Sequence, residues 1–429
     1  MALVFLALFV FFKTLETSAC MIRTKILLLL LLSLCSFNRI HTKCIVYAPN
    51  IKTVQAVVNN DWLSPPVMNL NSKDILQIGF DELSHEFHRF TYTIEHCEAD
   101  WSKSEGIFES DYLDGFNNIP IEDYENSRGT IVPYTHYQLQ IPNDYCKLKM
   151  SGNYRLTVYD ENEDNKKMFQ VEFMVTEQSM TVAMEVHTNT DIDFNKAHQQ
   201  LDITVRYPNH RVTNIDQQIF TIVKQNDEDR TAVINPKPTF VKHDGLAWTH
   251  HRDLIFQGGN EYRKYETLSL SHSTLGIDKM WWDGDSYHAY LFTDEPRHNY
   301  IYDQDANGAF YIRNSDNFEN ETTCDYVYVH YHLKSPNPTN VPIYVHGWWS
   351  TDEDISHYEM QYDEQDEAYH QTVLLKQGYY SYHYVQGQQN LESEGNFYQT
   401  ENRYQLYVYY RGINDRTWRL AAYRQLFFK

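Results

Sequence analysis

The sequence has few cysteines, and after residue 40 no two of them lie close together. Those beyond the start of the chain are Cys44, Cys97, Cys146 and Cys324, so the CxxC spacing of zinc and thiol redox sites is absent there. A disulfide between Cys97 and Cys146 and free buried thiols are both compatible with the sequence. A chain of 429 residues builds cores of ordinary size, and its fold therefore needs no disulfide or metal to be stable.

Long hydrophobic runs are also missing after residue 40, since none approaches the about 20 residues that span a bilayer. The start of the chain differs. Met21 opens a short basic region with Arg23 and Lys25, and the apolar run from Ile26 to Leu34 follows it. This pattern predicts a signal peptide within a leader region of residues 1–43, with translation starting at Met21. Cys35 is a weaker candidate for lipidation. The mature protein is expected to be exported and to have no membrane span.

Catalytic and nucleotide-binding signatures are absent: no GxSxG, GxxxxGK or GxGxxG string occurs. We therefore expect no enzyme and no cofactor, although two carboxylates of a glycosidase pair would leave no such string. The charge balance is 36 basic to 58 acidic residues, or −22. A field of that sign repels phosphate backbones, which argues against nucleic-acid binding.

What the chain has in abundance is aromatic side chains, with 34 Tyr and 22 Phe, and aromatics favour half-buried sheet surfaces. Two-residue alternation recurs, the pattern of strands with one buried face. Between residues 168 and 175, Phe169, Val171, Phe173 and Val175 share one face. Clear strands are predicted at residues 74–80, 90–96, 134–140, 152–159, 168–175, 325–333, 342–346, 369–375, 379–385 and 404–410. Weaker strands are predicted at residues 181–186, 201–207, 219–225 and 262–270.

These strands predict an all-β protein of tandem immunoglobulin-like sandwiches. We expect an N-terminal immunoglobulin-like sandwich over residues 44–176, a middle β-domain over 177–320, and a C-terminal early-set sandwich over 321–429. The stretch from 100 to 130 lacks alternation and is expected to be a large surface loop.

Two patterns raise the question of a metal. His330 and His332 lie two apart on one predicted strand, so both rings face the same side, with His346 as a third candidate. The sequence fixes no third ligand, and Tyr326 and Tyr328 continue that face as an aromatic stripe, so we expect no metal there. Asp303, Asp305 and Asn307 match the first half of a calcium loop, but Asn314 stands where a bidentate Glu belongs. A turn that caps its own backbone accounts for the same residues.

The segment IYVHGWWSTDEDISHYEMQYDEQDEAYHQTVLLKQGYYSYHYV (343–385) resembles the glycogen-binding type of early-set immunoglobulin module. In carbohydrate binders of this type exposed tryptophans stack on sugar faces, so Trp348 and Trp349 are the candidate sugar-binding residues. The alternative is that one of them packs in the sandwich core.

Over residues 45–425 the chain resembles the plug proteins of the type IX secretion system of Bacteroidota. Many short strings in a common order support this resemblance, among them SPPVMNL (64–70), HCEADW (96–101), GFNNIPIEDYENSRGT (115–130), SGNYRLTVY (151–159), DYVYVHYHL (325–333) and TENRYQLYVYYRG (400–412). The ending NDRTWRL (414–420) departs somewhat from the family pattern.

The resemblance implies a non-catalytic periplasmic protein that plugs the periplasmic opening of a SprA-like outer-membrane translocon barrel, and is held at the outer membrane by it. The free protein is expected to be a monomer. We expect the 100–130 loop to meet the barrel, with Trp101, Phe116 and Tyr124 as partner-binding anchors, because aromatics dominate binding hot spots. The alternative is that these three rings fold back on their own domain. The second candidate function is periplasmic carbohydrate binding through Trp348 and Trp349.

Overall fold

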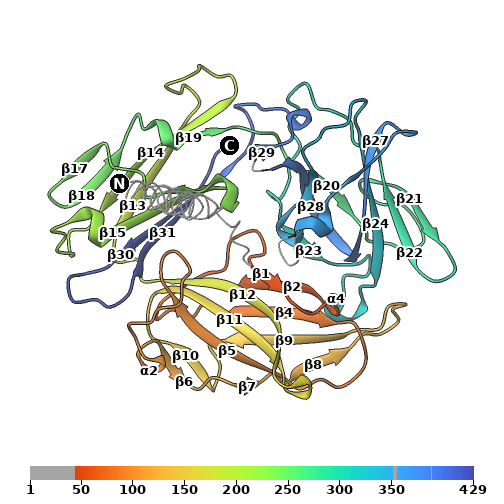
Figure 1. Cartoon of the computed structure of the whole chain (residues 1–429), viewed down its shortest axis with the longest axis horizontal. Coiled ribbons are helices and arrows are strands. Elements are labelled where there is room, and N and C mark those ends of the chain that lie inside the picture. Colours follow the sequence, from red (N-terminus) through yellow and green to blue (C-terminus); the bar gives the residue numbers. More distant parts are fainter. Residues whose placement is uncertain (1–43, 351–354, 388) are drawn as a thin grey trace, which may run out of the picture. The chain divides into compact units, whose positions relative to one another are not determined.

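The computed structural model describes residues 44–350, 355–387 and 389–429. The predicted leader, with Met21 and Cys35, lies outside the described residues. Strands make up most of the described elements, which confirms the all-β class (Figure 1). In the described part of the chain, no helix combines the length and apolar composition that a membrane crossing requires.

The first sandwich lies within residues 44–176 and has two main sheets. One sheet has the order β1 (Cys44–Val46), β12 (Lys166–Thr176), β11 (Gly152–Asp160), β5 (Phe90–Cys97), β7 (Ile119–Pro120), with β3 (Val67–Asn69) parallel to β12. The other has the order β2 (Ile51–Val58), β4 (Leu76–Glu82), β9 (Thr135–Ile141), β8 (Asp123–Asn126). The apolar face predicted for residues 168–175 is buried in the core between them, as alternation requires.

The second sandwich is built from two segments that are far apart in the sequence. One sheet has the order β13 (Thr181–His187), β14 (His198–Arg206), β18 (Gly245–Trp248), β17 (Phe240–Lys242), with β19 (Ile255–Gln257) beside β14. The other has the order β16 (Val233–Ile234), β15 (Ile219–Gln225), β30 (Arg403–Tyr410), β31 (Arg419–Phe427). Leu406 and Val408 of β30 share one core with Leu201 and Val205 of β14.

The third sandwich is formed by the strands between residues 263 and 390. One sheet centres on β28 (Gly378–Gln386), which pairs with β20 (Arg263–Glu266), β23 (Phe310–Ile312), β25 (Ile343–His346) and β29 (Gln389–Asn390). The other has the order β21 (Ile277–Trp282), β22 (Tyr287–Leu291), β24 (Tyr326–Lys334), β27 (Ala368–Lys376), β26 (Gln361–Asp363). Its core is separate from that of the second sandwich.

The expected boundary between residues 177–320 and 321–429 does not separate two sheets. Strands β20 to β23 precede residue 320 but belong to the third sandwich, and β30 and β31 follow it but complete the second. The third sandwich is therefore inserted into the second between β19 and β30. Alternation marks strands but does not say which strands pair, and that is why the sequence suggested consecutive domains.

The predicted surface loop over residues 100–130 contains short elements. They are α2 (Glu109–Tyr112), β6 (Leu113–Gly115), β7 and β8, with β6 paired to β10 (Cys146–Leu148). The other short elements are α3 (Ile215–Gln218), α4 (Asn320–Thr323), η1 (Glu161–Glu163), η2 (Asp229–Thr231), η3 (Arg252–Leu254), η4 (Trp348–Ser350), η5 (Ile355–Tyr358) and η6 (Glu392–Glu394).

Cys97 and Cys146, for which the sequence allowed either a disulfide or buried thiols, are free and buried. Burial raises the pKa of both thiols to about 12. Because the thiolate is the reactive form, both side chains behave as small apolar core residues.

Glu394, at the end of η6, is the buried carboxylate that ties the end of the third sandwich to its first strand. Its side chain accepts hydrogen bonds from Arg263 at 3.1 Å and from Arg297 at 2.6 Å. Burial by itself raises the pKa of the Glu394 carboxyl, but the two guanidinium groups outweigh it and lower the pKa to about 2.

This pairing predicts an acid-sensitive contribution to stability. The ordinary carboxyl pKa is 4.5, so between pH 4.5 and 2 the unfolded chain binds a proton that the folded chain does not, and stability falls as the pH falls. Glu394→Gln should cost about 3–5 kcal/mol at neutral pH, because two guanidinium groups lose their partner. It should also flatten the loss of stability below pH 4.5. Urea unfolding at pH 7 and pH 3.5 measures both effects, with the exposed Glu295→Gln as the control. If the pH dependence of the free energy of unfolding is the same in Glu394→Gln as in the unsubstituted protein, Glu394 is not the source of the acid sensitivity.

Candidate functional site

The contact between the first and third sandwiches centres on a buried ion pair. The side chain of Asp81 in β4 is 0% exposed and that of Lys376, the last residue of β27, is 1% exposed. Lys376 Nζ donates to Asp81 Oδ2 at 2.6 Å, Tyr326 Oη donates to the same oxygen at 2.7 Å, and His136 Nδ1 donates to Oδ1 at 2.7 Å. Burial by itself raises the pKa of Asp81, but Lys376 and His136 outweigh it and hold the pKa below its ordinary value.

Lys376 makes further contacts that explain its burial. Its Nζ donates to the backbone oxygen of Glu321 at 2.6 Å and lies 4.0 Å from the ring centroid of Tyr134. Tyr134 Oη in turn donates to the backbone oxygen of Cys324 at 2.7 Å. The ammonium group therefore has a carboxylate, a carbonyl and an aromatic face around it, and this replaces the water it loses.

The first and second sandwiches are joined by a second set of polar contacts. Glu98 accepts hydrogen bonds from Thr417 Oγ1 at 2.8 Å and from the backbone nitrogen of Trp418 at 3.0 Å. Tyr409 Oη of β30 donates to Asn153 Oδ1 of β11 at 2.8 Å. Because β30 also faces its own core, both of its faces are buried.

The second and third sandwiches meet at a buried carboxylate, Glu228. His383 Nε2 lies 3.2 Å from Glu228 Oε1, and Arg230 and Tyr262 also bond to the carboxylate. Arg230 Nη2 donates to Asn390 Oδ1 at 2.7 Å. Burial by itself raises the pKa of Glu228, but the Arg230 and His383 charges outweigh it and hold the pKa well below its ordinary value. Each sandwich thus contacts the other two through polar groups that are buried or half-buried.

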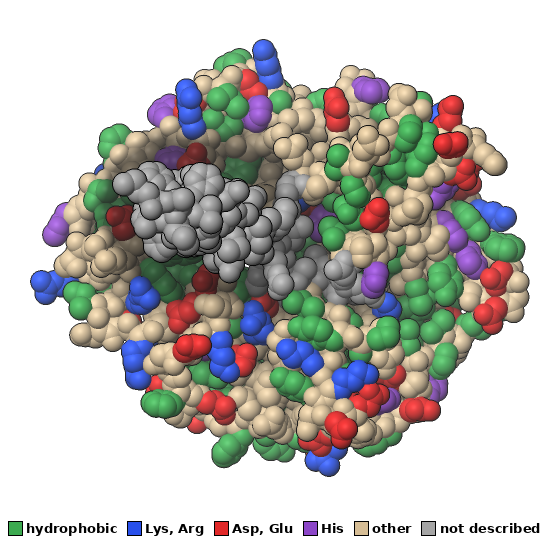
Figure 2. All heavy atoms as spheres, in the orientation of Figure 1, with side chains coloured by type: hydrophobic (Ala, Val, Ile, Leu, Met, Phe, Trp, Pro, Cys, Tyr) green, Lys and Arg blue, Asp and Glu red, His purple; other side chains and the backbone are tan. Residues whose placement is uncertain are grey.

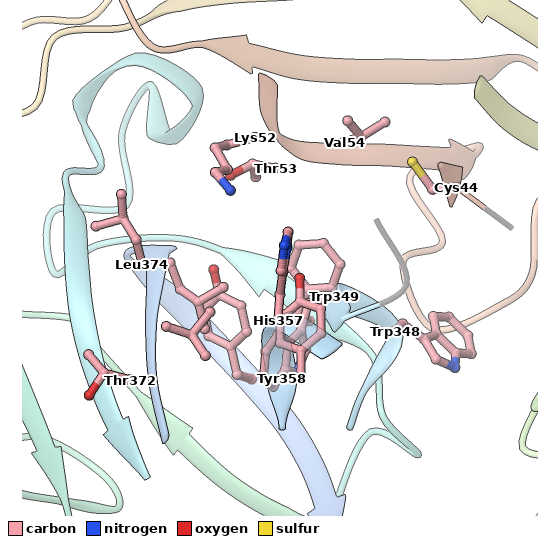
Figure 3. Close-up of a pocket in the computed structure, with 14 residues that line it drawn as sticks. Cys44, Lys52, Thr53, Val54, Trp348, Trp349, His357, Tyr358, Thr372 and Leu374 are labelled. Atoms are coloured by element: carbon pink, nitrogen blue, oxygen red, sulfur yellow. The ribbon is translucent and has the colours of Figure 1, made fainter. Parts of the chain in front are cut away.

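A cavity of about 180 Å³ lies at the contact of the first and third sandwiches. Lys52 and Thr53 of β2 point from one side toward Trp349, His357 and Tyr358 on the other (Figure 3). Pockets for small molecules usually exceed about 300 Å³. We therefore describe this cavity as part of the contact between the sandwiches.

The three predicted partner anchors contact different neighbours. Trp101 is half-buried and packs with Tyr409 at the contact of the first and second sandwiches. Phe116 follows β6 and is 72% exposed. Tyr124, on the edge strand β8, is 46% exposed, and its ring centroid lies 5.4 Å from that of Tyr137. Trp101 thus packs at a contact between two sandwiches, while Phe116 and Tyr124 face solvent. The role of all three in partner binding stays a prediction.

The candidate sugar-binding tryptophans do not form an exposed pair. Trp349 is 3% exposed, stacks on Tyr331 and donates its Nε1–H to the Ser381 backbone oxygen at 3.2 Å. Trp348 is half-buried, and the Arg403 guanidinium lies 4.8 Å from its ring centroid. Trp349 is thus the core tryptophan that the sequence offered as the alternative. A buried ring cannot stack on a sugar, so only Trp348 is left as a candidate sugar-binding residue.

The calcium-like loop uses its oxygens for other partners. Asp305 Oδ1 accepts from the Asn307 backbone nitrogen at 2.7 Å, and its other oxygen accepts from the Tyr262 backbone nitrogen. Asp303 Oδ1 accepts from Lys264 Nζ at 2.6 Å. An ammonium group thus binds the first candidate ligand, and the second caps the turn, as the alternative interpretation predicted.

Sequence reasoning missed two exposed aromatics near the predicted anchors. Phe108 precedes α2 and is 73% exposed, and Phe87 is exposed with its ring centroid 5.9 Å from that of Tyr124. Neither lies in an alternating segment, so pattern analysis gave no signal. Figure 2 shows one face of the first sandwich, on which acidic and basic side chains are interspersed.

The buried ion pair gives a direct test of the contact between the first and third sandwiches. Lys376→Met should lower the free energy of unfolding by about 3–5 kcal/mol, because it leaves a buried carboxylate without its counter-ion. Denaturant unfolding followed by circular dichroism measures this loss. Lys166→Met removes an exposed pair with Glu163 and should leave stability nearly unchanged. Equal effects of the two substitutions would contradict a stabilising role for the Asp81 pair.

Comparison with known proteins is consistent with the sequence resemblance. The family model described as "Type 9 secretion system plug protein 1st domain" matches residues 51–177. The crystal structure of a hypothetical protein from Parabacteroides merdae ATCC 43184 is 33% identical, with a TM-score of 0.86, and the match covers 91% of this chain and 100% of that chain. Collagen adhesin from S. aureus aligns over 90% of this chain and 95% of its own at 8% identity, and its TM-score of 0.13 carries no argument. No curated protein matches. The chain belongs to the type 9 secretion system plug protein family.

Proposed function

We propose that this protein closes the periplasmic opening of the type 9 secretion translocon, a SprA-like outer-membrane barrel, as a non-catalytic plug. One observation carries the proposal beyond family membership: each of the three sandwiches contacts the other two through hydrogen bonds of buried or half-buried polar groups. Asp81, Glu98 and Glu228 each accept hydrogen bonds from a different sandwich. A body held in this way resists deformation, which a plug across a wide opening requires.

The surface also suits a reversible contact. A plug that leaves when cargo passes needs an interface that is polar at its rim and has a few apolar anchors. The chain carries a net charge of −22. Four exposed aromatics stand on the first sandwich as candidate anchors: the neighbouring pair Phe87 and Tyr124, and separately Phe108 and Phe116.

The first experiment is affinity purification of the tagged protein from detergent-solubilised envelopes, with mass spectrometry of the proteins that co-elute. Recovery of the translocon barrel as the main partner would support the proposal. Elution without the barrel would overturn it. A strain that lacks the protein should also admit a hydrophilic dye that the intact outer membrane excludes.

Phe116 and Tyr124 give the residue-level prediction. Phe116→Ala and Tyr124→Ala should each reduce barrel recovery at least about tenfold, because a hot-spot aromatic contributes about 2 kcal/mol or more to binding. Phe240→Ala is the matched control, since the exposure of Phe240, 56%, lies between those of Tyr124 and Phe116, but Phe240 is on β17 of the second sandwich. Thermal unfolding of all three variants should match the unsubstituted protein. Unchanged recovery with both first-sandwich variants would place the contact elsewhere.

A further inference from the structure

A histidine cluster on the outer sheet of the third sandwich has no role in the contacts described above. Strands β24 and β27 pair in a register that places His332 directly opposite His370. Opposed residues in antiparallel strands project to the same face. The two rings stack with centroids 4.3 Å apart. Asp366, in the turn before β27, places its Oδ2 3.5 Å from His370 Nε2.

One nitrogen of each ring lacks a hydrogen-bond partner, which points to a ligand. The Nε2 atoms of His332 and His370 are both buried, and neither has a hydrogen-bond partner. A buried imidazole nitrogen without a partner is costly. His332 Nδ1 lies 3.3 Å from Thr293 Oγ1, and the tautomer that donates there leaves the Nε2 lone pair available to a metal.

We propose that His332, His370 and Asp366 bind a divalent transition-metal ion, with Zn²⁺ as the representative ion. One ligand atom from each of the three lies within 4.8 Å of the others. Two imidazole nitrogens and a carboxylate oxygen are a ligand set that Zn²⁺ accepts at about 2.0–2.2 Å from each atom. The Asp366 side chain is 58% exposed, so few neighbouring atoms restrict its rotation.

The surroundings leave room for the ion and for one more ligand. An open groove of about 620 Å³ contains the cluster and is also lined by Asp278, Lys279 and Tyr290. The Lys279 ammonium lies over the Trp281 and Tyr290 rings. Three protein ligands leave a fourth position for water or for a side chain from another protein.

Two other histidine groups of the third sandwich show why this cluster is distinctive. His288 Nδ1 and His330 Nε2 lie 2.8 Å apart and satisfy each other, and His288 Nε2 bonds Asp283 at 3.0 Å. Glu228, His346 and His383 also come together, but the Arg230 guanidinium bonds to that carboxylate. A positive guanidinium at the site disfavours a cation.

Zinc binding by the full protein, with any polyhistidine tag removed, tests the proposal. Isothermal titration with ZnCl₂ should show one site per chain that His332→Gln and His370→Gln each weaken at least about tenfold, because even outer-shell changes cost that much. Co²⁺ should give visible d–d absorption that both variants lose. Circular dichroism should show that both variants fold.

The matched control is His187→Gln. His187 Nε2 lies 3.5 Å from Asp202 Oδ2 in the second sandwich, the same separation as His370 and Asp366, and belongs to no three-ligand group among the described residues. The His187→Gln substitution should leave the Kd for Zn²⁺ unchanged. Absence of stoichiometric Zn²⁺ binding, or an unchanged Kd in the His332→Gln/His370→Gln double variant, would overturn the proposal.

Discussion

A buried carboxylate that must be satisfied is the constraint on which the arrangement of the first and third sandwiches depends. The Asp81 side chain is fully buried, and its donors are Lys376 and Tyr326 of the third sandwich and His136 of its own. An unpaired charge in such a place is costly, so the two sandwiches cannot separate or slide without losing several hydrogen bonds together. The pair therefore fixes geometry more than it adds net stability.

The same logic recurs at the other two contacts. Half-buried Glu98 and buried Glu228 are met by groups from a neighbouring sandwich, while the three main apolar cores are separate and only a smaller cluster joins the first and second sandwiches. Apolar contacts tolerate small displacements, whereas buried hydrogen bonds are directional. Three contacts of this kind hold the sandwiches as one body, which gives a physical basis for the plug role that the family implies.

The insertion of the third sandwich into the second reinforces this rigidity. Two chain crossings connect them, one after β19 and one before β30. Strand β30 then packs one face in the second core and places Tyr407 and Tyr409 in a cluster with Met174 of the first sandwich. The tyrosine richness of the sequence is explained in part by such strands, since tyrosine offers an apolar ring and a hydroxyl donor.

The sequence by itself determined the all-β class, most strand positions and the buried face of residues 168–175, because alternation is a local property of a half-buried strand. It also placed His330 and His332 on one face. It did not determine strand pairing, which is why the insertion, the partners of Asp81 and the approach of His370 to His332 were missed. Trp349 and Trp348 are adjacent in the sequence, yet one is a core residue and the other lies at a contact between sandwiches. Tertiary structure decided these points, because pairing and burial depend on residues that are far apart in the sequence, 295 positions for Asp81 and Lys376 and 320 for Glu98 and Trp418.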